Sequence, residues 1–424
     1  MHTEENTMKK IKNIFNETAY HYVSESGLNT YLIHRPGFKQ SSAVYGTPFG
    51  ALNLSQTING ETQVEHKSGL AHFLEHKLFE DDAVDVLSLF AQIGASGNAF
   101  TSYDQTMYYF NHNGPIAEPL KLLINFVSQF DISTVSVEKE KGIIVEEIKM
   151  YEQMPDMNLL METYRNVFHN YPFIYDIAGT EESVNATTLE DLEEAYRLNY
   201  ADHRMVLVIV SGESLEDIKD IVDEACKDHS KEDLNVQDVY PEEPTVVKHA
   251  HREIKGDITT PKMSYAFKFK YGQGNRLRDE FLLKIILEMN FSELNPEYQT
   301  LLDSGIFTNA FGFDVDLRDD LGVIYFFNES NEFEKFIVAI DTMMAQLNLD
   351  ELLFTQLKKR YYGEMIFSLS NISRIGITFA RAHFDGINYY DYLEMVNELT
   401  YEDLDSVRSY FSDVSKTSLL MTPF

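Results

Sequence analysis

Hydrophobic and polar residues follow two different periods in the first part of the chain. At residues 20–23 and 28–33, apolar positions alternate with polar ones on either side of Ser26-Gly27, which is typical of a β-hairpin that turns at the glycine. From residue 67 to 79 the apolar positions follow the helical period instead, and this predicts an amphipathic helix. Its apolar stripe consists of Leu70, Phe73, Leu74 and Leu78.

Further segments continue this mixture of helices and strands. Residues 106–110 have strand composition, and helices are expected at about 119–130, 137–154 and 183–200, the second of them ended by Pro155. The apolar run at 205–210 predicts a buried strand. Long helices between short strands indicate the α+β class, with mixed or antiparallel sheets that carry helices packed on one face.

A short repeat divides the chain in two. The sequence TLEDL at 188–192 leads through a helix into a strand, and TYEDL at 400–404 does the same half a chain length later. Between them, residues 229–244 are polar and acidic, which is typical of a linker. We therefore expect two homologous domains, residues 1–228 and 245–424, joined by an acidic linker at 229–244.

The charge of the chain excludes some classes of partner. It has 35 Lys+Arg against 68 Asp+Glu, a formal net charge of −33. Nucleic-acid binders, and proteins that dock on anionic membranes, need clustered basic residues, so this balance argues against both. It would suit a basic peptide, although most such charge is an ordinary solvated surface.

Cysteine content and hydropathy indicate the compartment. Cys226 is the one cysteine, which excludes a disulfide framework and a cysteine-based zinc ribbon and makes a reducing, cytoplasmic location the expectation. The N-terminal residues lack the apolar run and cleavage site of a signal peptide. The longest apolar run, at 205–210, is too short to span a bilayer.

The most specific chemical signal is the run His72-Phe73-Leu74-Glu75-His76. On a helix His72 and His76 lie one turn apart on the same face, where both imidazoles can bind one Zn²⁺ ion. Glu75 borders that face, within reach of a metal-bound water whose proton a carboxylate can take. The alternative is an ordinary amphipathic helix, but only about 0.04 chance copies of this pentad are expected in such a chain.

A catalytic zinc usually has three protein ligands and one open position, so a third ligand is needed. The helix at 137–154 is the best source, because Glu140 and Glu147 lie two turns apart on one of its faces. A buried carboxylate pair would need a partner, which a metal site supplies. Charge-rich surface helices are common, so a solvated pair is the alternative.

Together these segments resemble a known family. The pentad resembles the inverted motif H-x-x-E-H of the inverzincins, the pitrilysin-type zinc metallopeptidases. The helix at 137–154 resembles the second motif of that family, and residues 97–102 (GNAFTS) resemble its substrate-binding edge strand. Residues 171–180 (YPFIYDIAGT) are similar as well. The overall pattern is closest to the small two-domain bacterial members, which are similar to the mitochondrial processing peptidase.

The resemblance implies roles for the residues of the two motifs. The ligands of one zinc ion per chain would be His72, His76 and Glu147. Glu75 would be the general base that activates the zinc-bound water, and Glu140 a supporting carboxylate beside the site. The first domain would therefore be the catalytic one, since the second lacks the motif.

The resemblance also implies the fold and the reaction. The family builds two homologous half-shells around a chamber, and its members are zinc-dependent endopeptidases that hydrolyse short or unfolded peptides, as in peptide processing. Asn98, Ala99 and Phe100 would contact the peptide, which lies as an added strand. Strand addition uses main-chain hydrogen bonds and so tolerates varied side chains.

The second half departs from the family pattern. Members usually carry an Arg and a Tyr in a stretch of the form L-R-x-x-x-G-L-x-Y, which holds the substrate carbonyl. Leu301 and Thr308 stand at those positions here, and a hydrocarbon cannot donate to a developing oxyanion. Either nearby residues serve instead, with Tyr298, Arg318 and Tyr325 as candidates, or a second subunit supplies the pair.

We favour the second explanation. A heterodimer with a related subunit that supplies the Arg/Tyr pair is then the expected assembly, and a homodimer is the alternative. The rival hypothesis is a non-catalytic peptide-binding or structural subunit of the same family. The intact pentad weighs against it, because a structural zinc would not need Glu75 or an open coordination position.

Overall fold

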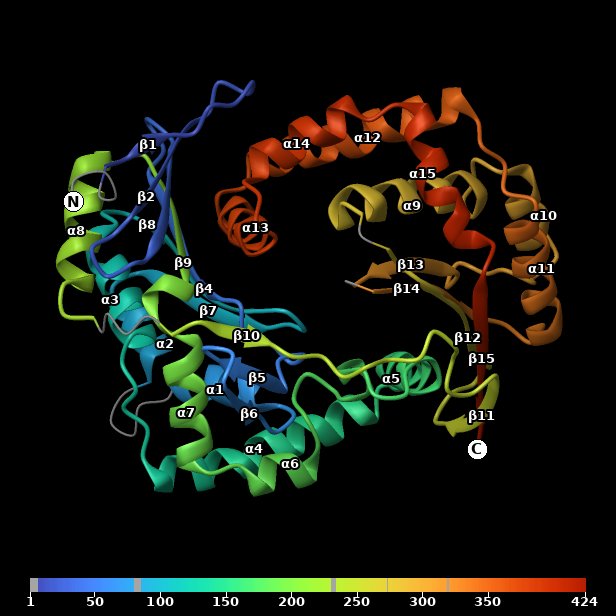
Figure 1. The fold of residues 1–424 in the computed structure, drawn as a ribbon, viewed down its shortest axis with the longest axis horizontal. Coiled ribbons are helices and arrows are strands. Elements are labelled where there is room, and N and C mark those ends of the chain that lie inside the picture. The colour runs from blue at the N-terminus through green and yellow to red at the C-terminus, as the bar shows by residue number, and fades with distance from the viewer. Residues whose placement is uncertain (1–6, 80–84, 230–233, 273, 319) are drawn as a thin grey trace. The chain divides into compact units, whose positions relative to one another are not determined.

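The computed structural model describes residues 7–79, 85–229, 234–272, 274–318 and 320–424, and it divides the chain into two compact units (Figure 1). Unit 1 comprises Met1–Ile148, Tyr175–Tyr240 and Met365–Tyr392, and unit 2 comprises Lys149–Ile174, Pro241–Glu364 and Leu393–Phe424. Each unit has its own sheet and helices, so the predicted two-domain α+β class with mixed sheets is confirmed. Within the predicted linker, residues 230–233 lie outside the described residues. The predicted domain boundaries stay a prediction.

Unit 1 is built on a seven-stranded sheet in the order β1-β2-β3-β9-β4-β8-β7. β3 and β9 pair in parallel, and all other neighbours are antiparallel. The strands are β1 Lys9–Lys10, β2 Thr18–Val23, β3 Asn29–His34, β4 Gln40–Thr47, β7 Ala95–Thr101, β8 Thr106–Asn113 and β9 Val206–Ser211. The predicted hairpin is β2-β3, and the predicted buried strand is β9, every residue of which is buried. A second, three-stranded sheet consists of β10 Val236–Asp238, β5 Ser55–Ile58 and β6 Thr62–Glu65.

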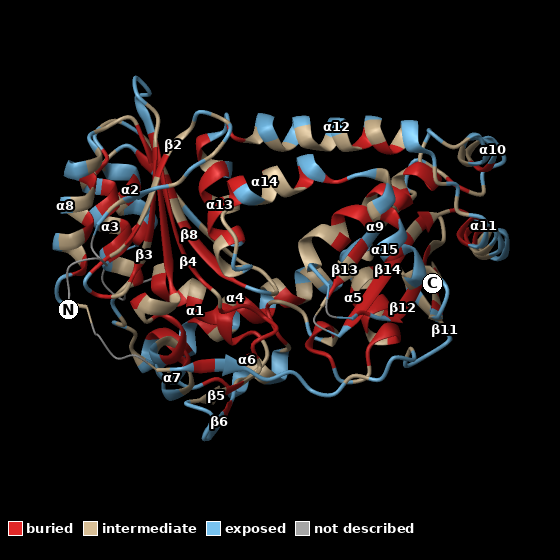
Figure 2. Ribbon diagram, turned by 45° about the horizontal axis from the view of Figure 1, so that its top comes forward, coloured by how far each residue is buried: buried red, intermediate tan, exposed pale blue. Residues whose placement is uncertain are grey.

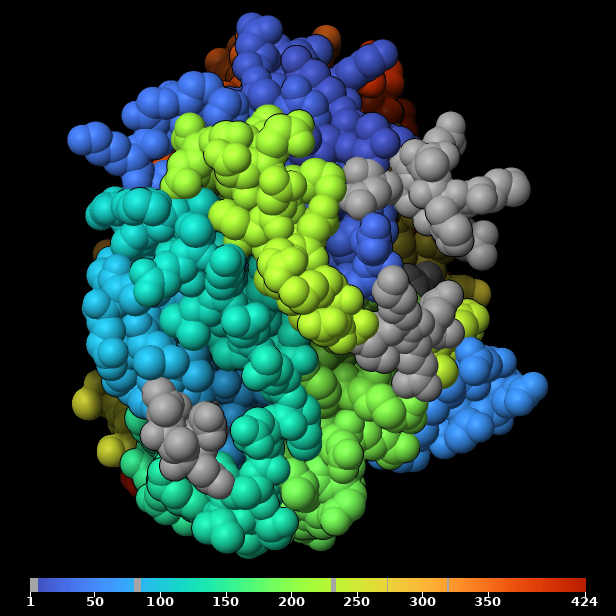
Figure 3. Space-filling view, turned by 90° about the vertical axis from the view of Figure 1, so that its left-hand side faces the viewer, coloured from blue at the N-terminus to red at the C-terminus, as the bar shows by residue number. Residues whose placement is uncertain are grey.

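Helices cover both faces of the large sheet of unit 1 (Figure 1). On one face α1, α2 and α3 pack against the strands, and α8 lies beside α3 on the surface (Figure 3). On the other face α13 packs against β4 and β9. Along β4, Tyr45 belongs to the core beneath α1 and α3, whereas Val44 faces α13, where a Cβ at Gly376 would lie 2.7 Å from its Cγ2. Unit 1 contains α1 Leu70–Phe79, α2 Val86–Gln92, α3 Ala117–Val127, α6 Glu181–Ala186, α7 Leu189–Asn199, α8 Leu215–Cys226, α13 Ile372–Phe384 and the 3-10 turn η2 Asp202–Arg204.

Unit 2 repeats the topology of unit 1. Its five-stranded sheet has the order β11-β15-β12-β14-β13, in which β11 and β15 are parallel and the other neighbours antiparallel. This matches the run β3-β9-β4-β8-β7 of unit 1 strand for strand and direction for direction, as a duplication requires. The strands are β11 His251–Gly256, β12 Lys262–Lys270, β13 Gly312–Leu317, β14 Leu321–Glu329 and β15 Val414–Pro423. The central strands β12 and β14 are largely buried and are red in Figure 2.

The remaining helices belong to unit 2 or continue from one unit into the other. Those of unit 2 are α5 Pro155–Val167, α9 Arg276–Asn290, α10 Pro296–Asp303, α11 Phe333–Ala345, α15 Asp405–Arg408 and the 3-10 turns η1 Pro172–Ile174, η3 Tyr401–Leu404 and η4 Ser409–Phe411. Chain segments of both units form α4 Thr134–Glu152, α12 Glu351–Ser368 and α14 Tyr389–Glu398. Within the described ranges no helix is both long and apolar enough to cross a membrane.

Two helix predictions need correction. The single helix expected at 183–200 is two helices, because the side chain of Thr188 accepts a hydrogen bond from the backbone N–H of Asp191 and so starts α7 afresh. Thr400 and Asp403 form the same capping box in the second copy of the repeat. Pro155 follows the end of α4, as predicted, but it also stands in the first turn of α5, a helix that the sequence pattern did not predict.

Candidate metal centre

The helix that carries the pentad begins at a close contact between two backbone segments. A Cβ at Gly69, just before α1, would lie 2.3 Å from the carbonyl oxygen of Ala178, and one at Gly179 would lie 2.4 Å from that of Ser68. Both glycines also have positive φ, +84° and +85°. Only glycine fits at either position, so residues 178–179 pack directly against the start of α1.

Helix α1, which carries the imidazoles of His72 and His76, is anchored in the core of unit 1. Its apolar stripe of Leu70, Phe73, Leu74 and Leu78 is buried in the core of unit 1, as predicted. His72 and His76 lie outside that stripe, and their ring centroids are 4.5 Å apart. The i, i+4 spacing therefore brings the two rings together, as expected.

Glu147 on α4 completes a set of three possible metal ligands. Its Oε2 atom is 3.8 Å from Nε2 of His72 and 3.6 Å from Nε2 of His76, and donor atoms of the three residues all lie within 4.8 Å of one another. A tetrahedral zinc with bonds of about 2.0–2.1 Å keeps its donors roughly 3.3 Å apart. Two imidazole nitrogens and one carboxylate oxygen at these separations fit a zinc ion after a small adjustment and leave a fourth position open.

Glu140 lies on the far side of His76. Its Oε1 atom is 3.0 Å from Nδ1 of His76, and its side chain is almost fully buried. Lys77, also buried, places its Nζ 3.5 Å from Oε2 of Glu140. Of the two carboxylates that the sequence offered as third ligand, Glu147 faces the Nε2 atoms, whereas Glu140 holds the His76 ring from behind. Lys77 was not predicted as part of the site, because a lysine directly after His76 has no spacing signal of its own.

Glu75 points to the neighbouring edge strand. The hydroxyl of Thr101 on β7 donates a hydrogen bond of 2.7 Å to Oε2 of Glu75. This contact ties α1, which carries the candidate base, to the strand that the sequence predicts for the substrate. Thr101 was not singled out among the site residues, although it lies inside the GNAFTS segment.

The surroundings set the charge of these groups. Burial, and then the neighbouring His76, lower the pKa of His72 to about 3, so His72 is neutral and able to bind a metal at neutral pH. Its Nδ1 is buried and has no hydrogen-bond partner among the described residues. For His76 burial opposes the charged form, but the hydrogen bond and charge of Glu140 outweigh it and raise the pKa. Burial raises the pKa of Glu75, which the Thr101 hydrogen bond offsets only in part.

Strand β7 lies at the edge of the sheet. It pairs with β8 on one side and is the last strand in the order. Asn98 is exposed, and Ala99 and Phe100 are half-buried. The predicted substrate segment is thus an edge strand to which an extended peptide can add.

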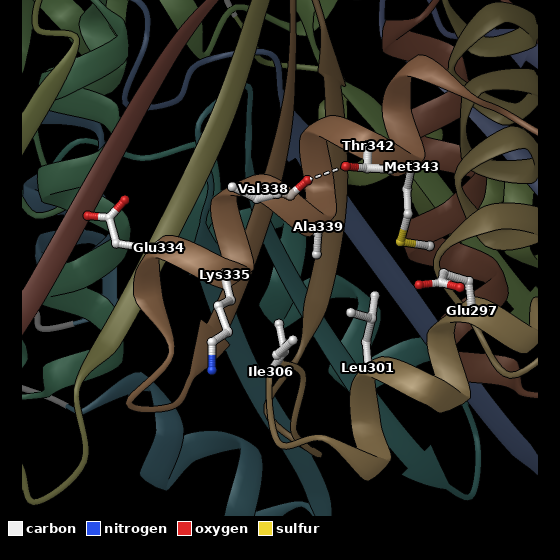
Figure 4. Close-up of a pocket in the computed structure, with 9 residues that line it drawn as sticks. All are labelled: Glu297, Leu301, Ile306, Glu334, Lys335, Val338, Ala339, Thr342 and Met343. Carbon is white, nitrogen blue, oxygen red and sulfur yellow. Dashed lines mark hydrogen bonds between the residues drawn. The ribbon is translucent and has the colours of Figure 1, made fainter.

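In unit 2, Leu301 and Thr308 make local contacts that suit their chemistry. Leu301 on α10 is largely buried and lines an apolar pocket of about 420 Å³ toward Val338 and Met343 of α11 (Figure 4). The hydroxyl of Thr308 donates to Oδ1 of Asn328 at 3.1 Å. Both side chains are therefore committed to packing and hydrogen bonding within unit 2.

The alternative residues in unit 2 are engaged as well. The guanidinium of Arg318 lies over the ring of Phe173, 4.8 Å from its centroid, and pairs with Asp316 at 3.0 Å. Tyr298 packs against the rings of Phe307 and Phe311. Tyr325 is buried and packs against Tyr164.

A second group of possible ligands lies elsewhere in unit 1. Asp202, Cys226 and His229 have donor atoms within 4.8 Å of one another. Hydrogen bonds stabilise the buried carboxylate of Asp202. Nδ1 of His229 lies 2.9 Å from it, and the hydroxyl of Tyr45 donates to it at 3.1 Å. Burial, followed by the charges of Asp202 and Asp223, raises the pKa of Cys226.

Family profiles match most of the chain. The profile described as Insulinase (Peptidase family M16) matches residues 62–181, which contain α1, β7 and α4. The profile described as Peptidase M16 inactive domain matches residues 186–370.

Individual relatives agree with these profiles. The "Uncharacterized zinc protease YmfH" of Bacillus subtilis (strain 168) is 30% identical over 404 residues, which are 92% of this chain and 93% of that protein. A Schizosaccharomyces pombe protein named "Probable mitochondrial-processing peptidase subunit beta" is 26% identical over 199 residues, 46% of this chain and 42% of that protein. The crystal structure of an M16-like peptidase from Alicyclobacillus acidocaldarius is similar with a TM-score of 0.90 and 28% identity, covering 98% of this chain and 100% of that one.

The likeness to YmfH extends over nearly the whole of both chains and includes both units. The predicted family resemblance, with bacterial relatives and a mitochondrial-processing one, is therefore confirmed. Together, the matched profiles and these relatives show that the chain belongs to the M16 peptidases, the insulinase or pitrilysin-type family of zinc proteases.

Proposed function

We propose that this chain is a zinc endopeptidase that hydrolyses short or unfolded peptides, with His72, His76 and Glu147 as its zinc ligands. The observation that carries the proposal is the approach of Glu147 to the Nε2 atoms of both histidines, at 3.8 and 3.6 Å. Glu75 lies beside this set and is hydrogen-bonded to an open edge strand. When bound, zinc supplies a Lewis acid that lowers the pKa of a water molecule and polarises the peptide carbonyl.

The chain's own residues would handle the proton. Glu75 takes a proton from the attacking water and then donates it to the leaving amine, so that one carboxylate serves as base and acid in turn. Its raised pKa brings it closer to neutral pH, where this exchange is most efficient. Glu140 holds His76 so that its Nε2 stays turned toward Glu147.

Strand β7 would bind the peptide by pairing with its backbone at Asn98, Ala99 and Phe100. Main-chain pairing requires an extended substrate segment, which short or unfolded peptides provide and folded domains do not. Because β7 also carries Thr101, a paired peptide would lie next to the strand residue that contacts Glu75.

We further propose that a related partner subunit supplies the missing Arg/Tyr pair in a heterodimer, as expected for a peptide-processing enzyme. Two observations support this. Leu301 and Thr308 are committed to contacts inside unit 2, and Arg318 is paired with Asp316 and packed on Phe173. A homodimer is the alternative assembly.

The same departure favours a second candidate, a non-catalytic peptide-binding or structural subunit. Chelator-sensitive cleavage of a peptide mixture by the purified chain, alone or with its partner, supports the enzyme. Zinc binding with no turnover in either preparation supports the second candidate and contradicts the first.

A further inference from the structure

Arg381 on α13 lies against the predicted substrate strand. Its guanidinium carbon is 5.7 Å from the ring centroid of Phe100 on β7, and its side chain is exposed. We propose that Arg381 binds a carboxylate of the peptide that pairs with β7, and so selects substrates that carry one at that position. This inference rests on the proposed binding of the peptide to β7 and adds a specificity residue to it.

The arginine stands on a well-anchored helix. Gly376 lets α13 approach Val44 closely, Phe379 packs against Tyr31, and Nδ1 of His383 is 3.1 Å from the Tyr31 hydroxyl. These contacts fix α13 on the sheet of unit 1, so the position of Arg381 beside β7 is set by packing.

A second contact places the other end of the helix. Ser373 donates a hydrogen bond to Asn111, which pairs with Ser96 at the start of β7. From Ser373 to Arg381 the helix rises roughly 12 Å, about the 13 Å that separates Ser96 from Phe100 along the strand. Both contacts therefore fit one helix that follows the strand direction.

Side chains alternate between the two faces of the sheet along β7, and this places Arg381 and the candidate zinc site on opposite faces. Thr101 faces Glu75, and a Cβ at Gly97 would lie 2.5 Å from the Phe90 ring of α2, so the odd-numbered residues face α1 and α2. Phe100 then faces the other side of the sheet, where α13 lies. In a peptide paired with β7, every second side chain would project toward Phe100 and Arg381.

The charge of Arg381 is the feature that selects the ligand. The chain has 68 acidic against 35 basic residues, yet Arg381 makes no ion pair with any residue that the structure describes. Its one polar contact there is with the π face of Phe100, which leaves the guanidinium edge able to bind a carboxylate with two parallel hydrogen bonds. The carboxylate can come from an Asp or Glu side chain or from the C-terminus of the peptide.

The experiment uses fluorogenic peptides that are identical except for Glu or Gln, placed in turn at each position, together with C-terminal acid and amide forms. Cleavage by the wild-type chain is compared with Arg381→Gln and with Arg374→Gln. Arg374 is an exposed arginine two turns earlier on α13, roughly 10 Å away, so its variant removes the same charge from the same helix. Arg381→Glu, assayed with Lys in place of Glu, tests whether the preference reverses.

We expect a KM about five- to tenfold lower for the Glu peptide at one position, or for the acid form at the terminus, with kcat little changed. Arg381→Gln should abolish this preference, Arg374→Gln should keep it, and Arg381→Glu should prefer Lys. A wild type that cleaves Glu and Gln peptides equally, or a preference that survives in Arg381→Gln, overturns the inference and leaves the proposed function intact. If no peptide is cleaved by the chain alone or with its partner, the proposed function fails, and fluorescence anisotropy with the same peptides and variants decides the carboxylate preference on binding alone.

Discussion

Thr101 donates a hydrogen bond of 2.7 Å to Glu75, and this single contact joins the edge of the sheet to the helix of the candidate metal centre. Thr101 is the last residue of β7, and Glu75 lies between the two candidate zinc ligands of α1. A peptide that pairs with β7 would therefore lie against the same strand that positions the candidate base.

Replacing Thr101 by Val should lower kcat about tenfold while KM and zinc content change little. Valine keeps the shape and the strand propensity but removes the donor, so the Glu75 carboxylate loses the contact that orients it. Steady-state kinetics with metal analysis checks this. Ser102→Ala is the matched control, because that hydroxyl bonds to the carbonyl of Gln105 instead. An unchanged kcat in Thr101→Val would show that the contact has no positioning role.

Removing a zinc ligand should release the metal. His76→Ala and Glu147→Gln each delete one of the three proposed ligands, so zinc measured after dialysis should fall from about one per chain to near zero. Glu140→Gln weakens only the support behind His76, and we expect zinc affinity to drop by about 10- to 100-fold. His112→Ala on β8 serves as the control and should retain its zinc. Full zinc content in Glu147→Gln would contradict the assignment of the third ligand.

A buried ion pair in unit 2 should matter for stability. Lys268 and Glu243 meet at 2.5 Å with side chains 0% and 1% exposed, and the backbone N–H groups of residues 169–171 also donate to Glu243. Glu243→Gln leaves a buried ammonium without its counter-charge, so the free energy of unfolding should fall by about 3–5 kcal/mol. Glu332→Gln breaks the exposed pair with Lys335 and should cost about 0–1 kcal/mol. Urea denaturation at pH 7 compares the two.

The same pair should make stability depend on pH. Burial raises the pKa of Glu243, but the Lys268 ammonium and the backbone donors outweigh it and hold the folded-state pKa below the usual value. The unfolded carboxylate has a pKa of about 4.3, so the pair contributes fully above that value and its contribution is lost as the pH falls toward the folded pKa. The difference between wild type and Glu243→Gln should therefore shrink on acidification. A difference that grows below pH 4 would contradict this sign.

Native mass spectrometry of the protein isolated from its own cells tests the proposed partner. We expect a complex of this 48.9 kDa chain with a second, different chain and one zinc, because Leu301 and Thr308 are engaged inside unit 2. A monomer or a symmetric dimer that cleaves peptides by itself would contradict the heterodimer.

The sequence predicted local chemistry better than long-range packing. Two histidines at i, i+4 share a face in any helix, and a carboxylate between them borders that face. The pentad could therefore be predicted as a candidate metal site without knowledge of the fold. The division of roles between Glu140 and Glu147 depends on how α4 crosses α1, and the residues alone left it open. The sequence TLEDL at 188–192 was recognised as part of a repeat but not as the capping box that Thr188 begins. One continuous helix was therefore expected at 183–200.

The position of α13 was beyond sequence patterns. This helix comes from the last quarter of the chain but packs on strands β4 and β9, which lie between residues 40 and 211. No local period encodes such a pairing, and the expectation of helices on one face of each sheet therefore missed the second layer in unit 1. Arg381 was missed for the same reason.

The most direct test of the proposed chemistry is the comparison of wild type and Glu75→Gln for zinc content and peptide cleavage in the same preparation. We expect equal zinc in both, because the proposed ligands are His72, His76 and Glu147, and a kcat about 10²- to 10⁴-fold lower in the variant, because the proposed proton acceptor is gone. Unchanged cleavage by a zinc-loaded Glu75→Gln chain would contradict the account.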